Sequence, residues 1–534
     1  MVNKLHKNGN PTFLDLFAGC GGMSLGFMNA GFECLAAIDM DSHAVQTMKD
    51  NFPKDKLVLE KDLSKYGPEQ FSTENGIKQV DVIVGGPPCQ GFSTARQRDG
   101  ANHGARLVRD PRRFLYRDFL RYVGFFHPSM FVMENVLGIR SASGGRFFSA
   151  VQNEARRLGY RVHGEEIKAW RFGVPQKRVR QLIIGTAEGL PIFAVRRVMK
   201  ETHALPSESD AKDLKKAVTL WEAIGDLPQL SSGGGSNEQQ YDIEKRRKHE
   251  EAYGLAYLRG VLSIHRSSQL TGHVARPHNS RDLRDFERLK EGEHAASAIA
   301  RGERMEFPYD RDNFKDRFTR QHRNRLCSTI VAHLAKDGLM FVHPTQQRSL
   351  TPREAARVQS FPDTFHFPKA RTHAFRMIGN AVPPLLAESI GEAIKNYFNT
   401  LDSGSSEVAK DLIPNNSSEA EKNVIHLLAA QKKGDLREIE RKKFQLGWNS
   451  IGYLFPGLHP DSAGDDGDIK FNSKNALGNK YMSLKRLIGR EYALSGWPMR
   501  LVPVALEARR RLLSGKLSQD EYYFSIAQMI GSRR

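Results

Sequence analysis

Short hydrophobic runs alternate with longer mixed segments between residues 12 and 186. Five of these runs are rich in β-branched or aromatic residues and end close to a glycine or an acidic residue, namely 12–17, 34–38, 80–84, 130–133 and 181–184. Runs of this length predict buried strands, and the mixed segments between them predict helices. The alternation is typical of an α/β fold in which helices cover a mostly parallel sheet.

The periodicity weakens between residues 190 and 326. A Gly/Ser stretch at 231–236 joins charged segments with helical spacing at 244–251 and 281–290. We interpret residues 190–326 as a second domain inserted into the first.

From residue 349 the α/β pattern returns, and it ends in an apolar helix at 385–398. The first domain is therefore divided into residues 11–189 and 327–400. We expect its last helix to pack back on the sheet near the start of the chain, because no helix is predicted before the strand at 12–17.

Residues 401–423 are rich in Ser, Asn and Gly and predict a linker. Residues 424–534 contain Trp448 and Trp497 and carry 19 basic against 11 acidic residues, which indicates a basic C-terminal domain rather than a disordered tail. Its role stays open between extra affinity for DNA and docking of a partner.

The composition and net charge of the chain limit the kinds of function that it can have. The 534 residues include 80 Lys or Arg against 61 Asp or Glu, a net charge of +19 that favours a polyanionic partner. The four cysteines form no Cys/His cluster, so neither a disulfide scaffold nor a zinc site is indicated, and we expect no metal. No apolar run approaches the roughly 20 residues that cross a bilayer. We expect a cytoplasmic protein that associates with the nucleoid and binds no membrane.

A glycine-rich turn follows the first predicted strand. Asp15 and Phe17 lead into Gly19, Gly21 and Gly22, and a helix is expected to begin near Met23. Such a turn lets the backbone approach a nucleotide-like ligand at the N-terminus of the helix.

Two acidic residues strengthen this interpretation. Asp39 ends the second predicted strand, at the distance of about 20 residues where a ribose-binding acid is expected, and Asp62 follows the next apolar stretch. The alternatives are a plain strand-to-helix connection and two solvated carboxylates.

The next predicted strands carry candidate chemistry at their ends. The strand at 80–84 runs into Gly85-Gly86-Pro87-Pro88-Cys89, a stiff loop that would hold the thiol of Cys89 at the carboxyl edge of the sheet. This position indicates a nucleophile, although a cysteine more often packs as a small buried hydrophobe. Glu134 directly follows the fourth strand and is a candidate acid. Arg178 and Arg180 precede the core of the fifth, at alternate positions that would share one face of an extended segment.

Together these motifs resemble the DNA (cytosine-5) methyltransferases of bacterial type, and they appear in that family's order. Further matching segments are 109–115, 350–363 and 379–384, so the resemblance spans residues 11–398. It implies a Rossmann-like, S-adenosylmethionine-dependent methyltransferase fold with a smaller target-recognition domain. It also implies the activity of a DNA (cytosine-5-)-methyltransferase.

The resemblance implies a role for each catalytic candidate. Cys89 would attack carbon 6 of the cytosine, and Glu134 would hydrogen-bond nitrogen 3 of the ring. Arg178 and Arg180 complete the catalytic set, with Arg180 matched to the arginine that holds the carbonyl at carbon 2. S-adenosyl-L-methionine would donate the methyl group and leave as S-adenosyl-L-homocysteine. Its implied binding residues are Phe17, Ala18, Gly19, Gly21, Gly22, Asp39, Met40, Asp62, Leu63, Pro87, Asn380 and Val382.

The implied substrate is double-stranded DNA, bound by a monomer. Because a stacked cytosine hides both faces of its ring, the base must leave the duplex. The arginine-rich segment 91–121 is suited to close over it, and residues 190–326 would read the target sequence. The expected DNA contacts are Gln90, Ser93, Arg96, Arg98, Arg109 and Arg276. The expected setting is a restriction-modification or phage-defence system, with cognate restriction or defence proteins as partners.

Two rival functions remain. An RNA (tRNA) cytosine-5 methyltransferase of similar chemistry would lack the long segment that separates the motif at 176–180 from the one at 348–363. A non-catalytic nucleic-acid-binding module would have no use for the combination of Cys89, Glu134 and Arg180.

Overall fold

The computed structural model describes residues 9–88, 114–142, 145–188, 199–208, 210–264, 269–306, 318–336 and 338–403, with residues 190, 193 and 195. The predicted basic domain at 424–534, the linker from residue 404 onward and Cys89 lie outside the described residues.

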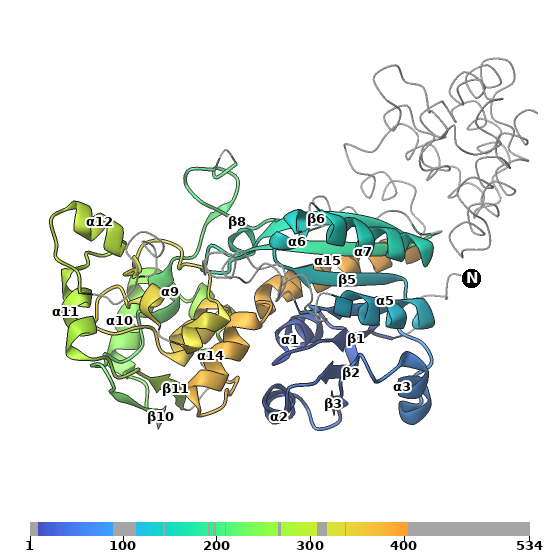
Figure 1. Ribbon diagram of the computed structural model, residues 1–534, viewed down its shortest axis with the longest axis horizontal. Helices are drawn as coiled ribbons and strands as arrows, with labels where there is room; N and C mark the ends of the chain where they lie inside the picture. The colour runs from blue at the N-terminus through green and yellow to red at the C-terminus, as the bar shows by residue number, and fades with distance from the viewer. Residues whose placement is uncertain are drawn as a thin grey trace, which may run out of the picture.

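A seven-stranded sheet forms the centre of the larger lobe, on the right of Figure 1. The strands lie in the order β3-β2-β1-β4-β5-β7-β6. Their bounds are β1 (Thr12–Leu16), β2 (Glu33–Asp39), β3 (Val58–Glu60), β4 (Val82–Gly85), β5 (Met130–Asn135), β6 (Tyr160–Lys168) and β7 (Val179–Ala187). β1 to β5 pair in parallel, whereas β7 is antiparallel to both β5 and β6. The sheet is thus mostly parallel with one reversed strand.

All five predicted strands are present, and the sheet has two more. β3 is only three residues long, too short for a recognisable period. β6 lies at the edge of the sheet and carries Arg, His, Glu and Lys, because an edge strand need not be apolar on both faces.

Helices cover both faces of the sheet. Alternate residues of one strand enter two different cores: Val82 and Val84 of β4 join one core, and Ile83 joins the other. The covering helices are α1 (Gly22–Asn29), α2 (Ser42–Asn51), α3 (Pro68–Asn75), α5 (Leu115–Phe126), α6 (Gly138–Ser141), α7 (Arg146–Arg157) and α15 (Pro384–Ser403). This arrangement of three layers is the predicted α/β fold.

The last described helix returns to the start of the chain. The return to the start of the chain is as predicted, but α15 packs mainly against α1 rather than on the strands, and glycines let the two helices approach closely. A Cβ atom at Gly26 would lie 2.3 Å from the Pro384 carbonyl oxygen, and one at Gly391 would lie 2.7 Å from the Cβ of Ala30. α15 continues to Ser403, so the linker cannot begin at residue 401 as predicted.

The smaller lobe, on the left of Figure 1, is built mainly from short helices. The predicted helices at 244–251 and 281–290 correspond to α10 and α11. The expected return of α/β character after residue 349 is wrong, since residues 349–403 contribute only helices. The remaining elements are η3 (Ala169–Phe172), β8 (His203–Ala204), β9 (Lys215–Lys216), α9 (Leu220–Ile224), β10 (Gly235–Gln239), α10 (Ile243–Tyr253), η4 (Ala256–Val261), β11 (Leu270–Val274), α11 (Ser280–Arg288), α12 (Ala295–Ala300), η6 (Ala332–Ala335), η7 (Leu339–Phe341), α13 (Pro352–Val358) and α14 (Arg371–Asn380).

Buried ion pairs fasten α13 to this lobe. Arg357 is fully buried and pairs with Asp226, after α9, and with Asp363 at 2.6 Å. Removing one partner of such a pair costs several kcal/mol, on the order of 3–5, because a buried charge is left uncompensated. The pairs therefore fix the position of α13 relative to α9.

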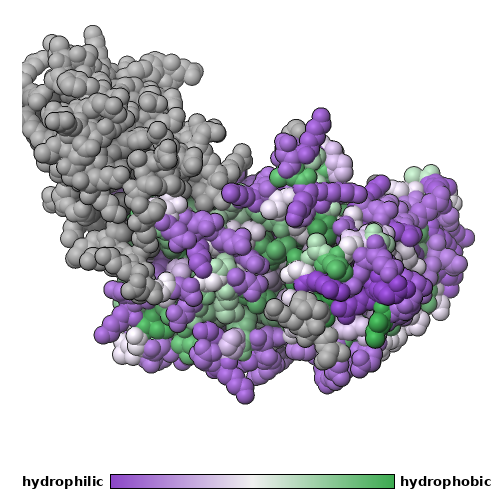
Figure 2. Space-filling model, turned by 180° about the vertical axis from the view of Figure 1, so that it is seen from behind, coloured by the Kyte–Doolittle hydropathy of each residue, from purple (hydrophilic) through white to green (hydrophobic). Residues whose placement is uncertain are grey.

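The described surface is largely polar. Figure 2, which shows the molecule from behind, has hydrophilic residues over most of this face, with smaller hydrophobic areas between them. Among the described helices, none combines the length and apolar character that a membrane span requires.

We predict that Gly26→Ala destabilises the protein by about 1–3 kcal/mol, because the new methyl group would press on the backbone of α15. The measurement is urea unfolding followed by circular dichroism. Gly260→Ala is the matched control, since a Cβ atom there meets nothing within 4 Å. Equal stability of the two variants would contradict the close packing of α1 and α15.

Candidate active site

A pocket of about 250 Å³ lies at the edge of the sheet where the parallel strands end. Ten of the twelve predicted cofactor residues line it, namely Phe17, Ala18, Gly19, Asp39, Met40, Asp62, Leu63, Pro87, Asn380 and Val382. The pocket thus joins residues from both ends of the divided domain. The family resemblance implies that these segments meet, and the pocket brings them together.

The other two predicted residues shape the pocket without lining it. Gly21 has a left-handed backbone (φ 85°), and a Cβ atom there would lie 2.3 Å from the ring of Phe52. A Cβ atom at Gly22 would lie 2.3 Å from the Val382 carbonyl oxygen. Both glycines therefore allow close packing around the turn, and Gly22 allows the wall that carries Val382 to approach α1.

Asp39 organises the turn after β1. Its carboxylate accepts the Gly19 N–H at 2.8 Å and the Asp41 N–H at 2.9 Å. Burial raises the pKa of Asp39, and these two hydrogen bonds oppose the rise. A carboxylate offers about four acceptor positions, so the two oxygens still have room for a ligand's hydroxyl groups.

Asp62 and Asp41 lie on the more open side of the pocket. The hydroxyl and N–H groups of Ser64 both donate to Asp62, and the hydroxyl is the main cause that lowers its pKa. Asp41 caps α2 and pairs at 2.6 Å with Arg376, which also lines the pocket.

Asp15 is a pocket residue that the sequence analysis did not assign to the site. The hydroxyl of Ser24 donates to its Oδ2 at 2.5 Å, while the buried Oδ1 has no hydrogen-bond partner among the described residues. Burial raises the pKa of Asp15 to about 7. An acidic residue inside an otherwise apolar strand is the signal that could have identified it.

The second part of the site is an ion pair between neighbouring strands. Glu134, at the end of β5, and Arg180, at the start of β7, lie 2.8 Å apart from Oε1 to Nε. The N–H of Arg180 does not point squarely at this oxygen, so Oε1 is buried without a hydrogen bond. The pair therefore leaves Oε1 of Glu134 available to a hydrogen-bond donor of a ligand.

The loop after β4 passes beside this pair. A Cβ atom at Gly86 would lie 3.5 Å from Oε2 of Glu134, and Pro87 and Pro88 line the same pocket. Asn135 fixes the loop, because its side-chain amide donates to the Pro87 carbonyl at 3.2 Å. Asn135 is not among the site residues predicted from the sequence.

Two predicted residues lie elsewhere. The guanidinium of Arg178 is buried and donates to backbone carbonyls of Ile330, Gly379 and Ala381, whereas the guanidinium of Arg180 lies against Glu134. β7 begins only at Val179, which is why the predicted shared face of Arg178 and Arg180 is wrong. Arg276, a predicted DNA contact, donates to the carbonyls of Leu334, Ala335 and Lys336 at the end of η6.

The remaining predicted site residues, Cys89, Gln90, Ser93, Arg96, Arg98 and Arg109, lie outside the described residues. The other three cysteines, Cys20, Cys34 and Cys327, are buried. Burial raises the pKa of each of these thiols, that of Cys20 to about 12. In the described part of the chain, no group of three or more His, Cys, Asp or Glu is placed to hold a metal ion.

The raised pKa of Asp15 leads to a prediction about stability. In the unfolded chain this carboxyl loses its proton near its ordinary value of 3.8, whereas the folded chain keeps the proton up to about 7. The contribution of Asp15 to the free energy of unfolding therefore falls as the pH rises from about 4 to 7, and then levels off. We expect Asp15→Asn to remove this slope, which is worth on the order of 4 kcal/mol.

Urea unfolding of both proteins at several pH values between about 4 and 8.5 measures the effect. Asp50→Asn, at an exposed position on α2, is the control and should keep the slope. A difference between wild type and Asp15→Asn that stays constant with pH would show that Asp15 ionises as in the unfolded chain.

Comparisons with known proteins agree with this geometry. The family model for C-5 cytosine-specific DNA methylase matches residues 11–396. The type II methyltransferase M.DdeI of Desulfomicrobium norvegicum is 34% identical over 404 residues, which cover 73% of this chain and 89% of the relative. The type II methyltransferase M.AgeI of Thalassovita gelatinovora is 33% identical over 432 residues, which cover 72% and 98%.

One solved structure is also similar. It is a protein encoded within an E. coli prophage and assigned to the DNA modification methyltransferases, 28% identical with a TM-score of 0.55, and the match covers 73% of this chain and 100% of that one. The ordered motifs, the pocket they form at the sheet edge and the family match over residues 11–396 lead to one conclusion. The chain belongs to the C-5 cytosine-specific DNA methylase family and is a DNA cytosine-5 methyltransferase.

Proposed function

We propose that the enzyme methylates carbon 5 of a cytosine that has left the stack of a specific duplex DNA sequence, through a covalent adduct with Cys89. The main support for this proposal is the Glu134–Arg180 pair, which lies beside Gly86 at the edge of the sheet where the parallel strands end. Pro88, directly before Cys89, lines the same pocket as Glu134 and Asp39. One pocket therefore offers groups suited to a pyrimidine and groups suited to a nucleoside.

The residues of the pocket fit S-adenosylmethionine, which is a nucleoside that carries a positively charged sulfur and an ammonium group. Asp39 has acceptor positions left for the ribose hydroxyls, and Asp62 would accept from the adenine amino group. The buried, unpartnered Oδ1 of Asp15 is an acceptor that a cationic ligand would satisfy. When bound, S-adenosylmethionine supplies a methyl group that is strongly electrophilic because its sulfur is positively charged.

Cys89 is the nucleophile that the chain has available. The thiolate is the reactive form of cysteine, and burial disfavours that form at Cys20, Cys34 and Cys327. Addition of the Cys89 sulfur to carbon 6 pushes an electron pair toward nitrogen 3 and the carbonyl at carbon 2. Carbon 5 would then bond to the methyl group as the bond between that group and the donor's sulfur breaks. Loss of the carbon-5 proton to a base would return an electron pair that breaks the bond between carbon 6 and the Cys89 sulfur and releases the thiolate.

Glu134 and Arg180 would stabilise the charge that builds up in the ring. A carboxyl group at nitrogen 3 shares a proton with it as the thiolate adds, and the guanidinium of Arg180 opposes the charge at the carbonyl of carbon 2. Because the two side chains already touch, little reorganisation is needed when a base arrives. Preorganised groups of this kind are worth several kcal/mol of transition-state stabilisation, about 3–4 for one donor.

DNA recognition would fall to the smaller lobe and to the loop after Cys89. Residues 190–326 are the proposed reading region, and Gln90, Ser93, Arg96, Arg98 and Arg109 are the proposed contacts of the loop. Arg276 is a weaker candidate, because carbonyls of η6 already occupy its guanidinium. We propose that the enzyme acts as a monomer on DNA in the cytoplasm.

The relatives M.DdeI and M.AgeI are type II methyltransferases. We infer that this enzyme likewise protects DNA against a cognate nuclease or belongs to a phage-defence system. Bisulfite sequencing of host DNA after expression tests both substrate and site. With the wild-type protein, sequencing should show one methylated sequence, and with Glu134→Ala it should show none. Unmethylated DNA after expression of the wild-type protein would contradict the proposal.

We predict that Cys89→Ser abolishes methyl transfer and leaves the dissociation constant for DNA within about threefold, since an alcohol is a far weaker nucleophile than a thiolate. A duplex with 5-fluorocytosine at the target should form a covalent adduct with the wild type, because fluorine cannot leave as the carbon-5 proton does. Intact-mass spectrometry detects the adduct. Cys34→Ser is the control and should still form it; an adduct with Cys89→Ser would point to another nucleophile.

A further inference from the structure

The wall of the pocket that carries Asn380 and Val382 is held from behind by buried polar side chains. Arg178 donates to the carbonyls of Ile330 at 3.0 Å, Gly379 at 3.4 Å and Ala381 at 2.7 Å. Gln359 donates to the carbonyls of Ile378 at 2.5 Å and Ala381 at 3.2 Å. Apart from the contact with Ile330, which precedes η6, these hydrogen bonds lie at the end of α14.

Gln176 connects these contacts to one another. Its side-chain amide donates to the side-chain oxygen of Gln359 at 2.5 Å and accepts from the N–H of Ile330 at 3.1 Å. Gln176, Arg178 and Gln359 are each less than 2% exposed. We call these three residues the clamp. None of them lines the pocket, so the clamp can act on a ligand only through the backbone that it holds.

The end of a helix explains why such a clamp is needed. The last carbonyls of an α-helix have no partner within the helix, and α14 ends at Asn380 just before the extended Ala381. Its last turn has no basic residue of its own, and Pro383 and Pro384 follow. The clamp supplies the missing donors, and the positive charge of Arg178 also suits the negative end of the helix dipole.

Close packing also constrains this segment. A Cβ atom at Gly379 would lie 2.2 Å from the backbone nitrogen of Ala332, so the helix end is pressed against residues 331–332. On the opposite side, Val382 touches the position of Gly22 in the turn after β1. The clamp therefore sets where Asn380 and Val382 meet the pocket.

We propose that Arg178 is a positioning residue for the methyl donor, acting through the backbone of residues 379–381 rather than on the target base. The proposal rests on the proposed function, in which this pocket binds S-adenosylmethionine. Residues 176–180 would then serve both substrates: Arg180 faces Glu134 and the base, and Gln176 and Arg178 hold the cofactor wall. The two arginines differ in role although they are two positions apart.

The test compares Arg178→Lys with wild type in steady-state methylation. A lysine keeps the charge but cannot reach three carbonyls at once. We expect KM for S-adenosylmethionine to rise about tenfold, the effect of losing one to two buried hydrogen bonds. We expect kcat and KM for DNA to stay within about threefold. Calorimetric titration of S-adenosylmethionine without DNA should show the same loss of affinity.

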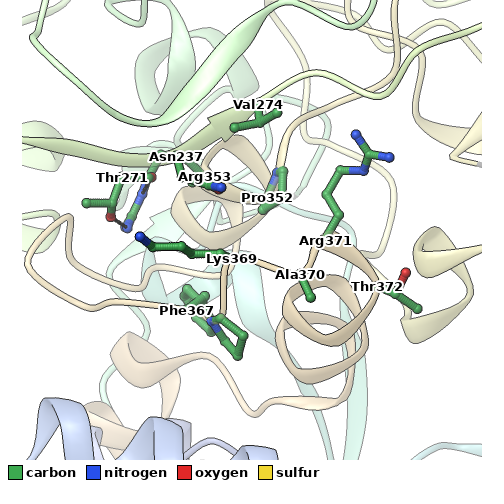
Figure 3. A pocket seen from close by; sticks show the side chains of 12 residues that line it. Asn237, Thr271, Val274, Pro352, Arg353, Phe367, Lys369, Ala370, Arg371 and Thr372 are labelled. Carbon is green, nitrogen blue, oxygen red and sulfur yellow. Dashed lines mark hydrogen bonds between the residues drawn. The ribbon is translucent and has the colours of Figure 1, made fainter.

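Arg353→Lys is the matched control. Arg353 is 2% exposed and donates to the carbonyls of Thr271, Pro362 and Phe365, so it is buried and bound to backbone as Arg178 is. Figure 3 shows it beside Thr271 at a separate cavity of about 330 Å³ in the smaller lobe. None of its partners lines the cofactor pocket, so KM for S-adenosylmethionine should not change even where the melting temperature falls.

A second variant keeps the test decisive if Arg178→Lys does not fold. Gln359→Met removes only the donors to Ile378 and Ala381 and should raise KM for S-adenosylmethionine by about threefold. The proposal is overturned if kcat or KM for DNA changes while KM for S-adenosylmethionine does not, or if the control variant raises it equally. A wild-type protein that fails to bind S-adenosylmethionine would instead overturn the proposed function.

Discussion

The reversed direction of β7 is the constraint on which the site depends. In a parallel sheet the strands end at one edge, and only a strand that runs the other way begins there. Glu134 therefore comes at the end of β5 and Arg180 at the start of β7, and the pairing of Glu134 with Leu182 brings the two side chains together. Either charge buried without its partner would cost several kcal/mol, on the order of 3–5. The sheet thus builds the pair, and the pair in turn favours this register of β5 and β7.

The pocket beside this pair is closed by segments that are far apart in the chain. The turn after β1 supplies one wall, and residues 376–382 supply the opposite one. The packing of α15 on α1 through Gly26 and Gly391 keeps these walls together. The turn after β1 and residues 379–382 are thus held largely by close packing and by hydrogen bonds to the backbone.

Much of the fold and of the pocket could be predicted from the sequence, because strong local patterns determine the strands and the residues at their ends. The five strands are apolar runs that the core requires, and Asp39 and Glu134 follow directly from strand ends. Arg178 could not be assigned correctly, since alternation carries meaning only inside a strand and β7 begins one residue later. Its partners at 330 and 379–381 are more than 150 residues away, with separations of 152 to 203. The position of Asp15 inside an apolar strand is visible in the sequence, but its raised pKa is not, because burial in the folded chain causes it.

The buried contact of Arg357 with Asp226 and Asp363 bears on how new specificities can be engineered. A recognition segment transplanted from a relative would arrive with its own residue opposite α13. If that residue did not place a carboxylate where Asp226 lies, Arg357 would pair with Asp363 alone, and its buried positive charge would be only partly compensated. Chimeric enzymes should therefore take α9 and its following acid together with the transplanted segment, or exchange α13 as well, so that donor and acceptor come from the same parent.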